Sequence, residues 1–324
     1  MKLRSFELTD HRQIVEVPLE AGSPAWFEDP VHRWLDLEAP EEEELNAFLE
    51  PLEIDPEMLR ARMEPGSNML LENLENLLLI RIPTQATSTT LDFTNILLLC
   101  LPTTLVTIHR DPLPAISDMA SRLTGRTRLK SATTSALVFQ VIGRLVAENF
   151  FAFGACRQKQ EALAKRMIEN SDSIEPEDVF TLRLQITNIG DANEDHAFCV
   201  DVLQRLETTS FSVADQREHF KELDRTLERH QRSMDRLEEN VKDLHQQFLL
   251  AGPRPDGQPP EGSDDSVSCF PAVDSHRGHL RDELREHAGT GRAIRVLHDF
   301  GIHGPCRDRH ACVLLQEGLV RLTV

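Results

Sequence analysis

Histidines and clustered carboxylates are the side chains best suited to chemistry in this sequence, and their spacing limits what they can do. His219, His230 and His245 fall on one expected helix, but no two lie four residues apart, the spacing that lets two imidazoles share a metal ion. Acids on the same helix, such as Glu238 and Glu239, are typical of a solvated helix face. The sequence contains no glycine-rich phosphate loop and no nucleophile elbow, so we expect no enzyme activity.

The cysteines have no pair at metal-ligand spacing, which favours buried or bystander thiols over a metal site. They are Cys100, Cys156, Cys199, Cys269, Cys306 and Cys312. Six histidines gather near the end of the chain, at His276, His279, His287, His298, His303 and His310. A histidine-rich tract of this kind can bind metal, whereas a shifted reading frame in this part of the chain would make these histidines by-products.

The chain is acidic, with 54 acidic and 35 basic side chains among 324 residues and a formal charge of −19. Such a charge repels nucleic acid and anionic membrane and attracts cations. The longest apolar runs, residues 77–80 and 96–101, are far shorter than the roughly 20 residues of a membrane-spanning helix. The first residues lead into charged sequence and do not resemble a secretory signal, so we expect a chain that starts in the cytoplasm.

The first part of the chain predicts an α/β domain over residues 1–128. We expect strands at residues 6–8, 13–17 and 34–37, then two short helices, one opening at Glu41 and one at Asp55. Three stronger strands are expected at the ranges 76–82, 91–101 and 105–110, separated by the connections 83–90 and 102–104. Because these connections are short, we expect a mixed, largely antiparallel sheet. A helix at 115–123 and a basic linker at 125–130 would close the domain.

The second part, residues 129–251, has uninterrupted helical periodicity. We expect long antiparallel helices over 131–169 and 178–206, and a third, capped by Ser212, that forms a stalk. The third helix carries a heptad seam with one gap at His230 and Gln231. The seam consists of Phe220, Leu223, Leu227, Met234, Leu237, Val241, Leu244 and Phe248.

An α/β domain followed by long helices that end in a stalk resembles the cytosolic part of CorA-type divalent-cation channels. The segment WLDLEAP at 34–40 resembles the opening strand and helix of that family, and residues 52–59 resemble its next helix. Residues 96–101 and LVTIHRDPLP at 105–114 resemble its paired strands and the following turn. The resemblance covers about residues 34–250.

One position departs from the family pattern. Many members carry a Glu-Asp pair after Pro-x-x-Leu, where the aspartate helps to bind a regulatory magnesium ion between subunits, but here Arg60 and Ala61 follow Leu59. The resemblance makes Asp224 the nearest candidate for the other interfacial carboxylate, against the alternative of a solvated helix face.

The tail, residues 252–324, does not fit the rest of the chain. Its proline, glycine and charge density predicts disorder, whereas the family has two membrane helices and a Gly-Met-Asn motif there. Moving the reading frame forward by one base lets residues 279–285 encode Ile-Tyr-Gly-Met-Asn-Phe and residues 270–279 encode Phe-Leu-Pro-Leu-Thr-Leu-Ile-Ala-Gly. Residues 313–321 can likewise encode Tyr-Phe-Tyr-Lys-Lys-Gly-Trp-Phe, a typical cytoplasmic membrane boundary. We therefore expect a frameshift near Ala251, with an ordinary disordered extension as the alternative.

The resemblance implies a homopentameric channel in the inner or plasma membrane, with a cytoplasmic N-terminal domain. It implies Mg²⁺ as the transported and regulatory ion, with Co²⁺, Ni²⁺ or Zn²⁺ as other candidates. The chain in its present frame would stay cytoplasmic and transport nothing, because none of it would span lipid. A soluble coiled-coil scaffold or regulator is the alternative that the same heptad seam supports. A metal-dependent enzyme would need a cluster of ligands that the sequence does not offer.

Overall fold

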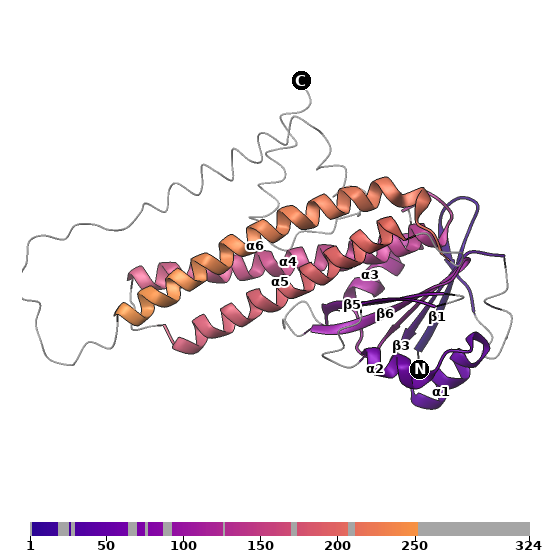
Figure 1. The fold of residues 1–324 in the computed structure, drawn as a ribbon, viewed down its shortest axis with the longest axis horizontal. Helices are drawn as coiled ribbons and strands as arrows, with labels where there is room; N and C mark the ends of the chain where they lie inside the picture. The colour runs from indigo at the N-terminus through magenta and orange to yellow at the C-terminus, as the bar shows by residue number, and fades with distance from the viewer. Residues whose placement is uncertain are drawn as a thin grey trace, which may run out of the picture. The chain divides into compact units, whose positions relative to one another are not determined.

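A mixed β-sheet followed by three long helices makes up the fold (Figure 1). The computed structural model describes residues 2–18, 26, 30–63, 70–74, 77–86, 93–125, 127–169, 174–206 and 211–251. The expected fold class is confirmed over these residues. The tail expected at 252–324 lies outside them.

The sheet has seven strands in the order β2-β1-β3-β7-β6-β5-β4. Their bounds are β1 Lys2–Leu8, β2 Ile14–Glu16, β3 Arg33–Glu38, β4 Leu71–Asn73, β5 Leu78–Gln85, β6 Phe93–Cys100 and β7 Thr104–His109. The antiparallel pairing expected from short connections is confirmed for β5, β6 and β7. The pair β3 and β7 is parallel and joins the N-terminal strands to the rest of the sheet.

Short helices and long helices cover opposite faces of the sheet (Figure 1). One face packs against α1 (Glu42–Leu49), η1 (Glu50–Leu52) and α2 (Pro56–Met63), where Leu45, Leu49 and Leu59 meet alternate residues of the central strands. The other face lies under α3 (Pro114–Leu123) and the long helices. Local sequence starts the short helices as expected, since Glu41 and Glu44 form a capping box at α1.

The sheet differs from the expected one at β4 and at Pro83. Strand β4 was not expected, and β5 runs three residues into the segment expected as a loop. Pro83 pairs with Asn95 of β6 on one side, whereas β4 covers only Leu78 to Ile80 on the other side. On that side the described residues pair with β5 no further than Arg81, whose N–H donates to the Leu70 carbonyl oxygen at 2.8 Å, so a proline without an N–H group fits at position 83.

The long helices are α4 (Thr134–Glu169), α5 (Pro176–Arg205) and α6 (Arg217–Ala251). All the expected seam residues of α6 from Phe220 to Leu244 are buried, and Phe248 packs against the same core. The expected cap was wrong: Ser212 accepts a hydrogen bond from the Ala214 backbone N–H at 3.3 Å, and a 3-10 turn, η3 (Ala214–Gln216), precedes α6.

Among the described residues, α4 is the one helix long and apolar enough to cross a membrane by length and composition. Most of its apolar window is buried inside the protein, against α3, α5, α6 and the sheet. Polar residues such as Gln140, Arg144 and Glu148 interrupt its apolar residues, so it contains no long uninterrupted apolar run. The core helix of a soluble domain has the same composition, so its burial explains its apolar character here.

Candidate functional site

A buried polar network joins strands β3 and β7, which overlap the segments 34–40 and 105–114 singled out in the sequence. Asp36 of β3 accepts hydrogen bonds from the Thr107 hydroxyl at 2.6 Å and from His109 Nε2 at 3.1 Å, both on β7. Trp34 Nε1 donates to Thr107 Oγ1 at 3.0 Å. Parallel pairing places these residues together, because Asp36 lies opposite Thr107 in the ladder.

The surroundings of His109 in this network favour its charged form. Its Nδ1 lies 2.7 Å from the carbonyl oxygen of Asp111, while Nε2 faces the Asp36 carboxylate, so both ring nitrogens donate. Burial lowers the pKa of His109, but the hydrogen bond and charge of Asp36 outweigh this and raise it above 6.5. The His109 and Asp36 side chains are only 1% and 4% exposed. This ion pair is therefore a structural element, out of reach of a substrate.

A second polar cluster fills the gap in the heptad seam. Asn193 of α5 donates from Nδ2 to Gln231 Oε1 at 2.7 Å, and its Oδ1 lies 3.2 Å from Nδ1 of His230. The His230 ring packs on two aromatic rings of α4, with centroid distances of 3.9 Å to Phe150 and 4.7 Å to Phe153. The gap is thus a polar layer between α5 and α6, and aromatic rings of α4 pack against it.

His196 extends this layer to the sheet. Its Nε2 donates to the carbonyl oxygen of Pro83 at 2.9 Å, which joins α5 to β5. Burial lowers the pKa of His196 to about 4, although the hydrogen bond to Pro83 opposes the shift. Burial and the neighbouring His196 lower the pKa of His230 to about 3. Both rings are therefore neutral near pH 7.

Asp224, the expected metal ligand, lies partly exposed on α6 beside other carboxylates. Burial raises its pKa, a hydrogen bond from the Gln204 side chain lowers it, and the charges of Glu228 and Asp201 raise it further, with a net rise. A divalent cation would relieve this repulsion. No group of three or more His, Cys, Asp or Glu side chains among the described residues is arranged to hold a metal ion, so Asp224 and its described neighbours do not form a complete site by themselves.

Arg60 occupies the position where the family pattern has an acid. Its Nη1 lies 2.9 Å from Glu42 Oε1, and its Nη2 donates to Asn46 Oδ1 at 2.9 Å, so it ties α2 to α1. Ala61, the next residue, stands where the family's metal-binding aspartate would be, and the guanidinium of Arg60 beside it repels a cation. The departure noted in the sequence therefore has a local structural role.

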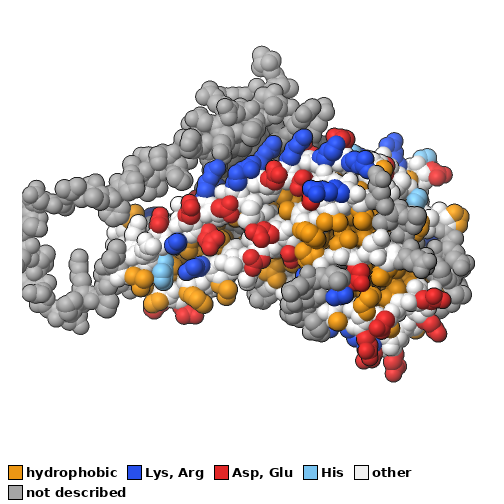
Figure 2. Space-filling view, in the orientation of Figure 1, with side chains coloured by type: hydrophobic (Ala, Val, Ile, Leu, Met, Phe, Trp, Pro, Cys, Tyr) orange, Lys and Arg blue, Asp and Glu red, His pale blue; other side chains and the backbone are white. Residues whose placement is uncertain are grey.

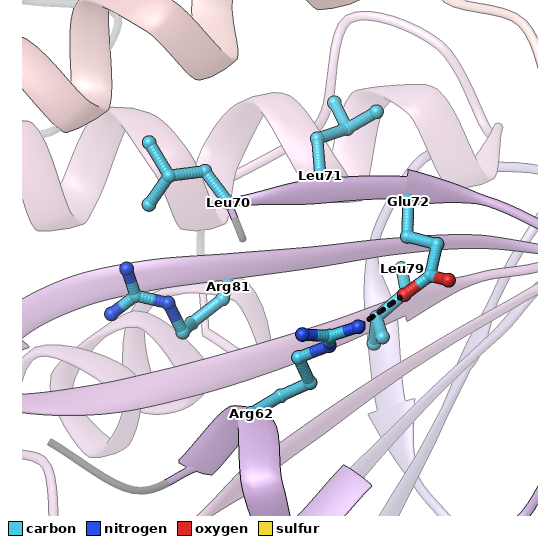
Figure 3. A pocket seen from close by; sticks show the side chains of 6 residues that line it. All are labelled: Arg62, Leu70, Leu71, Glu72, Leu79 and Arg81. Atoms are coloured by element: carbon cyan, nitrogen blue, oxygen red, sulfur yellow. Dashed lines mark hydrogen bonds and ion pairs between the residues drawn. The ribbon is translucent and has the colours of Figure 1, made fainter. Parts of the chain in front are cut away.

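A small pocket lies between α2 and the strands β4 and β5 (Figure 3). Arg62 and Arg81 reach into it, and Arg62 donates to Glu72 at 3.2 Å. Its walls are completed by Leu70, Leu71 and Leu79. The guanidinium of Arg81 also donates to Asn95 at 2.8 Å, so both cations already have partners within the fold.

The three cysteines in the described part of the chain are buried free thiols, as expected. Burial raises the pKa of Cys156 to about 11 and that of Cys199 to about 12, and it raises the pKa of Cys100 as well. Such thiols are protonated and unreactive near neutral pH. The other three cysteines lie outside the described residues.

Sequence reasoning found some of these residues without their partners. Asp36 and His109 belong to segments that had been singled out, but nothing in the sequence indicates that the two segments are adjacent parallel strands. His230 was visible as a gap in the seam. His196 and Asn193 were missed, although polar residues at otherwise apolar positions of α5 are a usable signal.

Comparison with known proteins gives one family and several related folds. Residues 29–251 match the family model described as CorA-like Mg²⁺ transporter protein. The curated proteins contain no match to this chain.

Three solved structures illustrate the shared fold. The soluble domain of CorA from Methanocaldococcus jannaschii is 17% identical, with a TM-score of 0.66 over 77% of this chain and 97% of that one. The full-length CmaX protein is 14% identical, with a TM-score of 0.64 over 98% and 94%. The ZntB cytoplasmic domain from Vibrio parahaemolyticus is 10% identical, with a TM-score of 0.61 over 76% and 96%.

Proposed function

The chain belongs to the CorA-like Mg²⁺ transporter family, and from this premise we propose that residues 1–251 are the cytoplasmic, metal-sensing part of a divalent-cation channel. The family is one of transporters and not of enzymes. We assign residues 1–128 to the α/β domain and residues 129–251 to the stalk region. The transported ion would be Mg²⁺, with Co²⁺, Ni²⁺ and Zn²⁺ as alternatives, and the intact assembly would be a homopentamer.

The observation that carries this proposal is the place where the family match ends. The match stops at residue 251, and the next 73 residues have no apolar segment in their own frame, whereas the frame one base ahead can encode Gly-Met-Asn after an apolar run. We therefore infer a frameshift near Ala251. Reading the gene around codon 251 tests this inference, and a nucleotide sequence whose shifted frame lacks Gly-Met-Asn would refute it.

The frameshift predicts two different behaviours for two versions of the protein. The chain as given should stay in the cytoplasm and carry no ion flux when it is mixed with lipid vesicles, because residues 252–324 contain no apolar segment of spanning length. A chain with the restored frame should insert into the membrane and pass Mg²⁺. Mg²⁺ flux through the chain as given would refute the proposed loss of transport.

Asp224 is the residue that we propose for metal sensing. Burial and then the charges of Glu228 and Asp201 raise its pKa, so a bound divalent cation would stabilise this side of α6, and a second subunit would supply the missing ligands. Arg60 and Ala61 stand where many family members have the Glu-Asp pair, with Ala61 in place of the aspartate, which makes the sensor differ from the family pattern on the side of the α/β domain.

Limited proteolysis of the full chain, with and without saturating Mg²⁺, tests the sensor. We expect Mg²⁺ to slow cleavage of the wild-type chain and to have no effect on Asp224→Asn. The variant should be slightly more stable than wild type without metal, because it removes a repelled carboxylate. Asp243→Asn, an exposed acid further along α6, is the matched control and should keep the response.

A soluble coiled-coil scaffold is the second candidate, since the buried seam of α6 is also typical of such proteins. Mg²⁺-independent protection of the wild-type chain would favour the scaffold and count against the sensor.

A further inference from the structure

The outer face of α6 carries a row of arginines on an otherwise acidic chain. Arg225, Arg229, Arg232 and Arg236 are spaced by four, three and four residues, so they share one helix face, opposite the buried seam. All four are exposed, and Figure 2 shows basic side chains in a line along α6. At 1.5 Å per residue the row is about 17 Å long.

Two members of this row have no carboxylate of their own. Arg225 lies 3.6 Å from Glu222 on the preceding turn. Arg229 and Arg232 make no ion pair within the described part of the chain. Four adjacent guanidinium groups repel one another, so an acidic surface brought against them would be bound favourably.

The outer face of α5 has the complementary character. Six exposed residues follow one another at spacings of four, three, four, three and four, and we call them the α5 strip: Phe180, Leu184, Thr187, Asp191, Glu194 and Phe198. Three of them are large apolar side chains, exposed by 60% at Phe180, 51% at Leu184 and 52% at Phe198. A line of exposed apolar residues on one helix face is typical of an interaction surface.

Charge also makes the α5 strip a match for the arginine row. Asp191 and Glu194 lie in its middle and form no ion pair among the described residues. Arginine binds carboxylates through two parallel hydrogen bonds and stacks on aromatic rings. The two carboxylates and the flanking Phe180 and Phe198 therefore offer both kinds of partner that an arginine row prefers.

We propose that the arginine row of one copy docks on the α5 strip of a second copy. This inference rests on the self-association that the proposed function requires and names the surfaces that make it. Because the two surfaces are different parts of the same chain, the contact is head-to-tail and repeats from copy to copy into a ring or an open chain.

The contact should be weak and sensitive to salt. The α5 strip is about 27 Å long, and a helix face about 10 Å wide then buries roughly 270 Å² on each partner, against about 800 Å² in a typical stable complex. Since the arginines are exposed, salt should screen their attraction to the carboxylates.

Sedimentation velocity of the full chain at rising concentration tests this docking. We expect association at about 50 mM salt that weakens about tenfold or more at about 500 mM. Arg229→Glu/Arg232→Glu should reduce association to a similar extent, and so should Asp191→Lys/Glu194→Lys. The chain that carries all four substitutions should associate again, because the charges are exchanged. Lys165→Glu/Lys242→Glu, two exposed lysines outside the row, is the control and should behave as wild type.

Each outcome either supports or overturns the docking of the arginine row on the α5 strip. Rescue by the four-fold variant supports the docking, with circular dichroism as the check that every variant is folded. A wild-type chain that stays monomeric, a double variant that associates normally, or a four-fold variant without rescue overturns it. Association that requires Mg²⁺ and Asp224 but is unchanged by both double variants would overturn only the docking and leave the proposed metal sensing in place.

Discussion

The sheet and the helical bundle bury histidine in opposite charge states. In the sheet, His109 donates from both nitrogens, and its pKa is raised by Asp36 in spite of burial. In the bundle, His196 bonds to a backbone carbonyl and His230 to an amide; burial lowers the pKa of His196 to about 4, and burial together with the neighbouring His196 lowers that of His230 to about 3. Histidine favours its charged form in the sheet because His109 contacts a carboxylate there. In the bundle His196 and His230 are neutral, because their hydrogen-bond partners are a carbonyl and an amide.

The two clusters of buried polar residues therefore have different structural roles. Asp36 and His109 have side chains that are common in active sites, but here they hold two parallel strands together. His196 and His230 hold α5 against β5 and α6 through hydrogen bonds that tolerate no added charge. Neither cluster is a reaction centre, which agrees with a family of transporters.

Removing the His109 ring should have the largest effect. His109→Ala leaves the Asp36 carboxylate buried without its cation, and we expect a loss of about 3–5 kcal/mol in the free energy of unfolding. Urea denaturation at pH 7 measures it. His230→Ala in the bundle leaves no unpaired charge, so it should lower the free energy of unfolding by less than His109→Ala does. An equal or larger loss for His230→Ala would contradict the different charge states of the two histidines.

A double variant sharpens the same test. Asp36→Asn with His109→Gln removes both charges and keeps polar side chains in place. We expect it to be more stable than His109→Ala, because no unpaired charge remains. If the double variant is as unstable as the single one, the loss comes from packing and not from the ion pair.

Acid should destabilise the bundle, and alkali the sheet. A buried histidine with a lowered pKa binds fewer protons folded than unfolded, so stability falls as pH drops below 6.5 toward 4 for His196 and toward 3 for His230. His109, with a raised pKa, contributes stability below pH 6.5 that is lost as pH rises through its folded pKa. Unfolding free energies measured from pH 5 to pH 9 would reveal both trends.

The His230→Leu variant tests the loss of stability in acid. Below pH 6.5 each of the two bundle histidines should lower the free energy of unfolding by about 1.4 kcal/mol per pH unit, or about 2 kcal/mol at pH 5. The leucine variant should lose only the contribution of His196. A constant penalty from the amide oxygen of Asn193, left without its donor, would be the same at all pH values. The proposed neutral state is wrong if the pH profile of the variant runs parallel to that of wild type.

How far the sequence predicted the fold depended on whether a feature is local. The seam of α6 followed from spacing alone, and Phe220 to Leu244 are buried as expected. The parallel contact of β3 with β7 joins segments about 70 residues apart, and no local pattern announces such a pairing. Pro83 was misjudged because its place in a strand depends on where β4 ends.

The candidate metal site was predictable only in part for the same reason. Asp224 was found by resemblance, but its neighbour Asp201 comes from another helix, and the arginine row opposite the seam emerges only once the buried face of α6 is known. Sites made of several elements need the fold before their members can be recognised.

Gly154 offers the smallest effect and a test of whether the two regions unfold together. A Cβ atom added at Gly154, in the middle of α4, meets no atom within 4 Å, so Gly154→Ala should stabilise the helix by about 1 kcal/mol. If sheet and bundle unfold as one unit, the single thermal transition moves upward. If they unfold separately, only the transition of the helical bundle moves to higher temperature. The transition of the sheet, which His109→Ala lowers, stays where it is. Gly190→Ala in α5, equally unobstructed, should act alike, and a loss of stability in both variants would mean that these helix positions are covered by a partner.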